Sequence, residues 1–280
     1  MSAGLKLRRG VWVGRLGLPQ LFLFLALAPG LAQAADAPCP PPIAEEIDDV
    51  PLPHLAAGLK PGATLYALVV GSATVLGPDL APAPPVAAGA GGKGQPPAPP
   101  APSPTGFPWQ MARALEAGVH NLHVALTVIG SRGLSAEDML ARITQELPKH
   151  PYRVVLWQTG TVDAVNELPP GDFYETLADG AATVANAGAD LVLIDPQYSR
   201  FLQDNANLEP YQDALQTAAA LPGVSLFHRF DLMHAWADSH ALDLERTARA
   251  DRPAVAARLH ACLGRELARQ LVAQAGAAGR

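Results

Sequence analysis

Short apolar runs alternate with longer amphipathic stretches along most of the chain, which is the pattern of strands followed by helices. The apolar runs predict strands at residues 65–71, 122–129, 153–157, 190–194 and 224–227. The amphipathic stretches predict helices at residues 109–117, 135–147, 172–187, 208–220 and 253–273. Ser135 and Asp138 have the spacing of a helix-capping box, and Pro253 suits the first turn of the last helix.

Five strands separated by helices predict an α/β domain with a parallel sheet that is covered on both faces. In such a sheet, ligands bind outside the carboxyl ends of the strands. The turns after the first four strands are residues 71–77, 130–133, 158–163 and 195–198. We therefore expect these four turns to border one crevice.

Residues 1–34 have the features of an export signal. Lys6, Arg8, Arg9 and Arg15 precede an apolar stretch from Leu18 to Leu31, and Ala32-Gln33-Ala34 fits a small-x-small cleavage site. The stretch is short and contains Pro19 and Pro29, so it is a poor permanent membrane anchor. These features predict a periplasmic or secreted protein with no stable transmembrane anchor after cleavage. They leave open whether export follows the general or the twin-arginine route.

Cleavage after Ala34 would remove four positive charges and no acidic residue, so the formal charge would change from −6 to −10. A chain this acidic is a poor partner for nucleic acid. The remainder divides into a Pro-rich arm at residues 35–61, expected to be irregular, and a domain at residues 62–280. Residues 78–106 contain ten prolines and several glycines, a composition that predicts a disordered insertion within that domain.

The chain has two cysteines, Cys39 and Cys262. In an exported protein an even pair favours a disulfide, and this one would close almost the whole domain into one loop. Two buried free thiols are the alternative.

The strand-end turns contain several short sequence blocks whose residues could take part in catalysis. The run VVGSATVLG at residues 69–77 leads from a strand into a small-residue turn, where many α/β hydrolases hold a serine nucleophile. Later turns contain GSRG at 130–133, WQTGTVD at 157–163 and DPQY at 195–198. In this order, the blocks resemble those of the SGNH (GDSL-type) hydrolases over residues 62–272, apart from the insertion. The resemblance implies a three-layer, flavodoxin-like SGNH-hydrolase fold with a five-stranded parallel sheet.

The chemistry of that family is acyl transfer from an ester. A serine attacks, a histidine takes its proton and an aspartate orients the histidine, while the serine N–H, a glycine N–H and an asparagine hold the oxyanion. Aligned on the glycines of the first block, Ala73 occupies the nucleophile position with Ser72 beside it, whereas a shift of one residue makes Ser72 the nucleophile. Gly130 stands at the oxyanion glycine. Val162 stands at the asparagine, a loss that would lower turnover on the order of 10²–10³.

The C-terminal block departs furthest from the family pattern. Aligned on residues 259–263 (LHACL), Asp251 stands at the aspartate and Ala254 at the histidine. An aspartate alone is too weak a base to deprotonate a serine. The resemblance therefore implies a pseudoenzyme in which Ser72 and Asp251 are remnants of the catalytic set. Asp251 has a second interpretation as the N-cap of the last helix.

Other polar residues have two interpretations each. Gln158, Gln197 and Tyr198 stand at strand ends and could either contact a ligand or hold loops in place. His260 is interpreted either as a buried core histidine or as a histidine on the surface of the last helix. His120 and His123 have no Cys or carboxylate partner at ligand spacing, so we expect no metal site and no cofactor.

The working hypothesis is an exported, catalytically impaired protein that binds an acyl, glycan or protein partner in the former active-site crevice. One alternative is a working serine esterase or deacetylase that uses Ser72 with a base such as His260. Another is a structural component of an envelope polysaccharide machine that uses only the fold.

Overall fold

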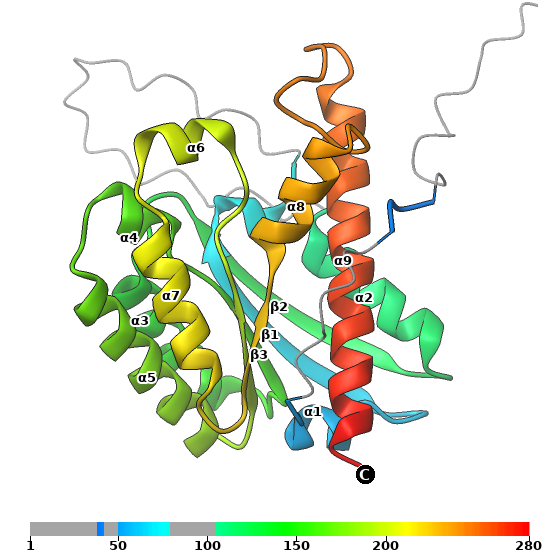
Figure 1. Cartoon of the computed structure of the whole chain (residues 1–280). Coiled ribbons are helices and arrows are strands. Elements are labelled where there is room, and N and C mark those ends of the chain that lie inside the picture. The colour runs from blue at the N-terminus through cyan, green and yellow to red at the C-terminus, as the bar shows by residue number, and fades with distance from the viewer. Residues whose placement is uncertain (1–37, 42–49, 79–104, 280) are drawn as a thin grey trace, which may run out of the picture. The chain divides into compact units, whose positions relative to one another are not determined.

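Five parallel strands form one sheet at the centre of the structure (Figure 1). Their order in space is β2-β1-β3-β4-β5, and their bounds are β1 Thr64–Ser72, β2 His123–Ser131, β3 Val154–Gln158, β4 Asp190–Ile194 and β5 Val224–Phe227. This order is that of flavodoxin-like folds, in which the chain winds in opposite directions from the first strand. The crevice between the carboxyl ends of β1 and β3 is the switch point where such folds bind ligands.

The structure is a computed structural model of the 280-residue chain, and it describes residues 38–41, 50–78 and 105–279. These residues belong to one compact unit, residues 34–280. The export signal at residues 1–34 and nearly all of the insertion at 78–106 lie outside the described residues, so both stay predictions.

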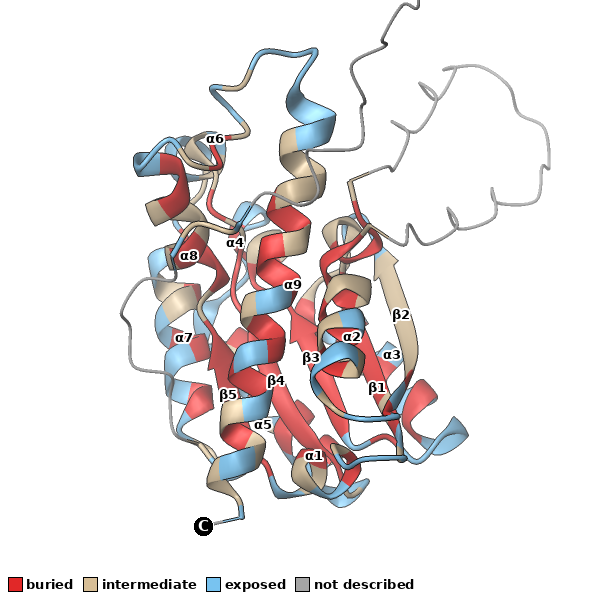
Figure 2. Ribbon diagram, turned by 90° about the vertical axis from the view of Figure 1, so that its right-hand side faces the viewer, coloured by how far each residue is buried: buried red, intermediate tan, exposed pale blue. Residues whose placement is uncertain are grey.

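Successive residues of β1 show why the sheet is covered on both faces. Leu68 and Val70 pack into one hydrophobic cluster, while Ala67 and Val69 pack into a second cluster on the other side, as the two-residue period of a strand requires. The first cluster includes α3 Ala136–Glu146, α5 Pro170–Asn186 and α7 Glu209–Ala219. The second includes α1 Pro53–Gly58, α2 Phe107–Gly118 and α9 Arg252–Ala277. The predicted three-layer α/β fold is therefore confirmed, and Figure 2 shows the buried stripes of these helices facing the buried sheet.

Short helices follow the carboxyl ends of several strands. These are η1 Ala73–Leu76 after β1, α4 Thr161–Val165 after β3, α6 Arg200–Asn205 after β4 and α8 Arg229–Asp238 after β5; a further turn, η2 Leu147–Lys149, ends α3. The capping box at the start of α3 is present, because the Ser135 side chain accepts from the Asp138 N–H and the Asp138 carboxylate accepts from the Ser135 N–H.

The N-terminal arm is more ordered than its composition suggests, so the expectation of an irregular arm is wrong for residues 53–58, which form α1. The reason is tertiary packing: Leu52 and Leu55 are fully buried, and the Leu55 N–H donates to the carboxylate of Asp190 at 2.8 Å. Farther towards the N-terminus, Cys39 is joined to Cys262 of α9 in the expected disulfide. No helix among the described residues is long and apolar enough to cross a membrane.

Candidate functional site

Two glycines let the turn after β1 fold back over the sheet. Gly71 and Gly130 are paired on β1 and β2, and a Cβ on either would approach a Val75 methyl of η1 to 2.7 Å. Real side chains essentially never approach this closely, so these positions need glycine. As a result η1 packs directly on both strands, and Ser72, the last residue of β1, lies half-buried at the switch point beside Gln158, the last residue of β3.

The Ser72 hydroxyl belongs to a closed ring of three hydrogen bonds. The Gln158 Nε2 donates to Ser72 Oγ at 2.9 Å, and Thr74 Oγ1 donates to Gln158 Oε1 at 3.0 Å. The third bond joins Ser72 Oγ and Thr74 Oγ1 at 3.0 Å. Since Thr74 already gives its proton to Gln158, Ser72 must donate in this third bond. The ring therefore directs the Ser72 proton towards a hydroxyl oxygen, which is not a base at neutral pH.

A buried arginine lies next to this ring. Arg229, the first residue of α8, is only 2% exposed. Its Nη2 donates to Gln197 Oε1 at 3.2 Å, its Nη1 donates to Thr74 Oγ1 at 3.5 Å, and the ring of Phe107 lies 5.5 Å from the guanidinium carbon. Burial lowers the pKa of Arg229 to about 10, against the opposing effect of Asp195. At neutral pH it is still a cation, so a buried positive charge lies next to the hydrogen-bond ring.

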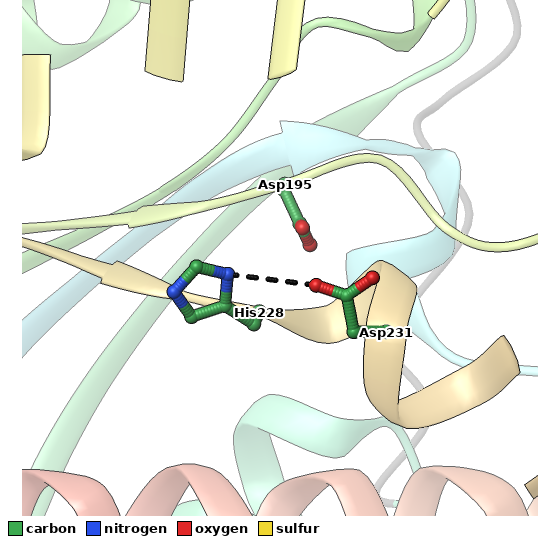
Figure 3. Close-up of side chains that lie close together, drawn as sticks. All are labelled: Asp195, His228 and Asp231. Atoms are coloured by element: carbon green, nitrogen blue, oxygen red, sulfur yellow. Dashed lines mark ion pairs between the residues drawn. The ribbon is translucent and has the colours of Figure 1, made fainter. Parts of the chain in front are cut away.

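Three further titratable side chains converge at the ends of β4 and β5. Figure 3 shows Asp195 beside His228 and Asp231, and the His228 Nδ1 lies 3.7 Å from the Asp231 Oδ2. Asp195 is 4% exposed and accepts from the Phe230 N–H at 2.9 Å. Burial raises the pKa of Asp195 well above its ordinary value, while the Phe230 N–H bond acts in the opposite direction. Asp195 therefore fixes the start of α8, and its burial favours the protonated form more than in an ordinary aspartate.

These three side chains are the only group within the described residues whose donor atoms gather closely enough to suggest a metal ion, all within 4.8 Å of one another. A tetrahedral Zn²⁺ with bonds of about 2.0–2.1 Å needs ligand atoms only about 3.4 Å apart. The group would have to contract, and the nearby Arg229 cation would repel the ion. The geometry therefore does not fit a tetrahedral zinc centre.

The other residues that the sequence singled out for binding have distinct positions. Gln158 is 1% exposed and is held within the ring, so its present contacts hold loops together. Gln197 is half-buried and accepts from Arg229. Tyr198 is 9% exposed; its ring stacks on His234 at 4.5 Å and meets Phe230 edge-on at 5.5 Å, so it packs against α8.

The hydrogen bonds of the Ser72 hydroxyl run to Gln158 and Thr74, and none runs to the candidate residues of the C-terminal block. Asp251 is exposed at the N-cap of α9, and its side chain makes no capping bond and has no side-chain partner within the described part of the chain. The reason is its helical backbone (φ −94°, ψ −12°), because a capping side chain needs an extended backbone. Ala254 is also exposed, in the first turn of α9. His260 is 8% exposed, and its Nδ1 accepts from the Phe107 N–H at 3.1 Å, as expected for a core histidine.

Two members of the site, Thr74 and Arg229, were not predicted. A signal for Arg229 exists, because it follows the last apolar run by two residues and thus lies at the same sheet edge as the other turns. The turn after the fifth strand is not among the four turns that the sequence analysis expects to border the crevice. Thr74 has no such signal, since its role depends on how η1 folds back.

The model of a family described as the Non-GDSL lipase-like family matches residues 37–277. No curated protein matches the sequence.

Several solved structures share the fold at low sequence identity. An acetylxylan esterase from Geobacillus stearothermophilus is 16% identical, with a TM-score of 0.55 over 76% of this chain and 96% of that one. A member of the lipolytic G-D-S-L family from Veillonella parvula is 15% identical, with a TM-score of 0.50 over 73% of this chain and 98% of that one. A lipase/acylhydrolase from Enterococcus faecalis is 17% identical, with a TM-score of 0.50 over 73% and 95%.

Proposed function

Because this chain belongs to the Non-GDSL lipase-like family, within the SGNH superfamily, we propose that it is a catalytically impaired member. In this proposal the strand-end crevice binds a ligand and does not hydrolyse an ester. The ester chemistry of the superfamily favours an acyl or glycan compound as that ligand, with a protein partner as the alternative. Export to the periplasm or beyond belongs to the same proposal, and it is supported by the Cys39–Cys262 disulfide.

The observation that carries the proposal is the hydrogen-bond ring at Ser72. A serine attacks an ester efficiently only when a base accepts its proton. Here the partners of the Ser72 hydroxyl are the Thr74 hydroxyl and the Gln158 amide, and neither accepts a proton at neutral pH. The Gln158 N–H also occupies a lone pair of Ser72 Oγ, which weakens this oxygen as a nucleophile.

The oxyanion side of the crevice supports the same conclusion. Gly130 is retained, but the packing of η1 against β2 already requires a glycine at this position. Its presence is therefore no sign of an oxyanion site. Val162, at the position where the family has an asparagine, lies in α4 and has no polar side-chain atom to donate. Without that donor, any remaining turnover would be lower on the order of 10²–10³.

The proposal is tested with purified protein, a short-chain aryl ester and a fluorophosphonate probe. We expect no turnover above that of the Ser72→Ala variant and no labelling, with a folded circular-dichroism spectrum for both proteins. Turnover or labelling that is present in the wild type and absent from Ser72→Ala would overturn the proposal.

A second candidate, a working serine esterase, is favoured by one observation. His228 and Asp231 pair an imidazole with a carboxylate at the carboxyl end of β5, which is the arrangement that orients a general base. His260 is less suited to that role because its Nδ1 already accepts from Phe107. If His228 is the base, the ester assay shows activity that both Ser72→Ala and His228→Ala abolish, while His260→Gln retains it.

A further inference from the structure

We propose that the strand-end crevice binds a carboxylate monoanion and that Arg229 is its anchor. This inference rests on the proposed function in one respect, namely that the crevice is a binding site. It adds the chemical class of the ligand and the residue that selects it.

The first argument is that, within the described residues, Arg229 has no hydrogen-bonded counter-ion. The guanidinium of Arg229 is 2% exposed, and within the described residues its hydrogen bonds reach only the neutral oxygens of Thr74 and Gln197. Its Nε–H has no partner there. Buried charges are costly unless they are paired and hydrogen-bonded, and folded proteins therefore pair them. Asp195 is thus an electrostatic neighbour of Arg229, but no anion in the described residues accepts a hydrogen bond from the guanidinium.

The second argument is the contrast with the other arginine near this edge of the sheet. Arg200 of α6 forms a bidentate pair with Asp243, both contacts at 3.1 Å, and also meets Glu245 at 3.5 Å. The fold thus gives hydrogen-bonded carboxylates to the more exposed arginine, whereas among the described residues the carboxyl group of Asp195 acts on the buried arginine through electrostatics alone. This allocation is the opposite of what stability alone favours, and it indicates that Arg229 is kept for a ligand.

The third argument is the geometry of what surrounds the guanidinium. Its position is fixed from one side by the Phe107 ring at 5.5 Å. Gln197, which accepts from Nη2, is half-buried, follows β4 in a loop and can turn aside. A carboxylate taking its place would accept two parallel N–H bonds, the geometry that guanidinium and carboxylate share.

Charge balance favours a carboxylate over a phosphate. One buried cation is neutralised by one monoanion, whereas a phosphate dianion would leave an excess negative charge. That excess would face Asp195, whose carboxyl group already interacts electrostatically with Arg229. We therefore expect acetate or butyrate to bind more tightly than inorganic phosphate, and acetamide, the neutral analogue of acetate, to bind least.

The experiment titrates the wild-type protein with sodium acetate, sodium butyrate, inorganic phosphate and acetamide at constant ionic strength, by calorimetry and by NMR of the arginine Nε–H signals. Arg229→Gln removes the anchor. Arg132→Gln is the matched control, because Arg132 is exposed in the turn after β2 at the same edge and its loss changes the net charge equally. We expect Arg229→Gln to weaken carboxylate binding roughly 10- to 150-fold, and Arg132→Gln to weaken it less than about twofold.

Equal affinity of Arg229→Gln and the wild type for acetate would overturn the inference, as would acetamide binding as tightly as acetate. If Arg229→Gln does not fold, the wild-type titration decides alone, since an anchor at Arg229 requires one buried Nε–H signal to shift on saturation. Ser72-dependent ester turnover together with intact carboxylate binding would overturn only the proposed function. Crevice binding confined to neutral compounds would overturn only this inference.

Discussion

An unpaired buried cation costs stability, so replacing Arg229 with an apolar side chain of similar length should make the ligand-free protein more stable. Burial lowers the pKa of Arg229 to about 10, well below the ordinary value of an arginine. Its folded pKa lies below its unfolded pKa, so at any pH below about 10 the folded state carries the full cost of holding the charge. That cost is about 3 kcal/mol at 1.36 kcal/mol per pKa unit.

Arg229→Met removes this cost together with the unpaired Nε–H. It also removes the bonds to Gln197 and Thr74, of which the second is long at 3.5 Å, and each is worth about 0.5–1.5 kcal/mol. The balance predicts that the free energy of unfolding of Arg229→Met exceeds that of the wild type by about 1–2 kcal/mol. It is measured at pH 7 from the midpoint of urea unfolding, with an unchanged dependence on urea concentration showing that only stability has changed.

Arg132→Met serves as the control and should stay within about 0.5 kcal/mol of the wild type, because Arg132 is exposed. A loss of more than about 1 kcal/mol in Arg229→Met would refute the reasoning. It would show that the guanidinium is a structural group whose neutral contacts already compensate for its burial.

Three further predictions concern the frame that positions the site. Gly264→Ala should destabilise the protein by about 1–3 kcal/mol, because the new Cβ would lie 2.5 Å from Gln110 Cβ and 2.7 Å from Met111 N of α2. In the control variant Gly276→Ala, in the same helix, the new Cβ meets nothing within 4 Å, so the free energy of unfolding should rise by up to about 1 kcal/mol. Equal shifts of the two thermal unfolding midpoints would contradict the close packing at Gly264. Cys39→Ser opens a loop with a sequence separation of 223 and should lose about 2–5 kcal/mol, an effect that must vanish when both proteins are compared under reducing conditions. Burial raises the pKa of Asp163, so at a pH above the ordinary Asp pKa the folded state binds more protons than the unfolded chain. The free energy of unfolding should therefore fall by up to about 1.4 kcal/mol per pH unit as the pH rises from the ordinary pKa to the raised one. Asp163→Asn should lose this pH dependence of the urea midpoint, and an unaltered dependence would exclude Asp163 as its source.

The sequence predicts the sheet well because strand signals are local. The apolar runs at 190–194 and 224–227 coincide with β4 and β5. The short helices α1 and α6 are not predicted because their stability is tertiary. Helix α6 is held by Arg200 against Asp243 of a distant loop, and α1 by the buried Leu55. Neither contact leaves a periodic pattern in the six residues of the helix.

The site was only half predictable for a related reason. Ser72 and Gln158 end strands, so topology alone places them at the switch point. The direction of the Ser72 proton depends instead on Thr74, whose hydroxyl reaches Gln158 only because η1 folds back over Gly71. The burial of Arg229 likewise depends on Phe107, which is 122 positions away in the chain.

The cation and the missing base are linked through electrostatics. During acyl transfer a catalytic histidine becomes a cation. With Arg229 already touching Thr74, next to Ser72, an imidazolium about 5 Å from the guanidinium would be disfavoured by about 3 kcal/mol at an effective dielectric constant of 20. A histidine restored alone would therefore work against this charge and be slowed by about two orders of magnitude. The positive charge of Arg229 that would attract a carboxylate also disfavours the imidazolium of a catalytic histidine. We therefore treat carboxylate binding and impaired ester hydrolysis as consequences of one residue.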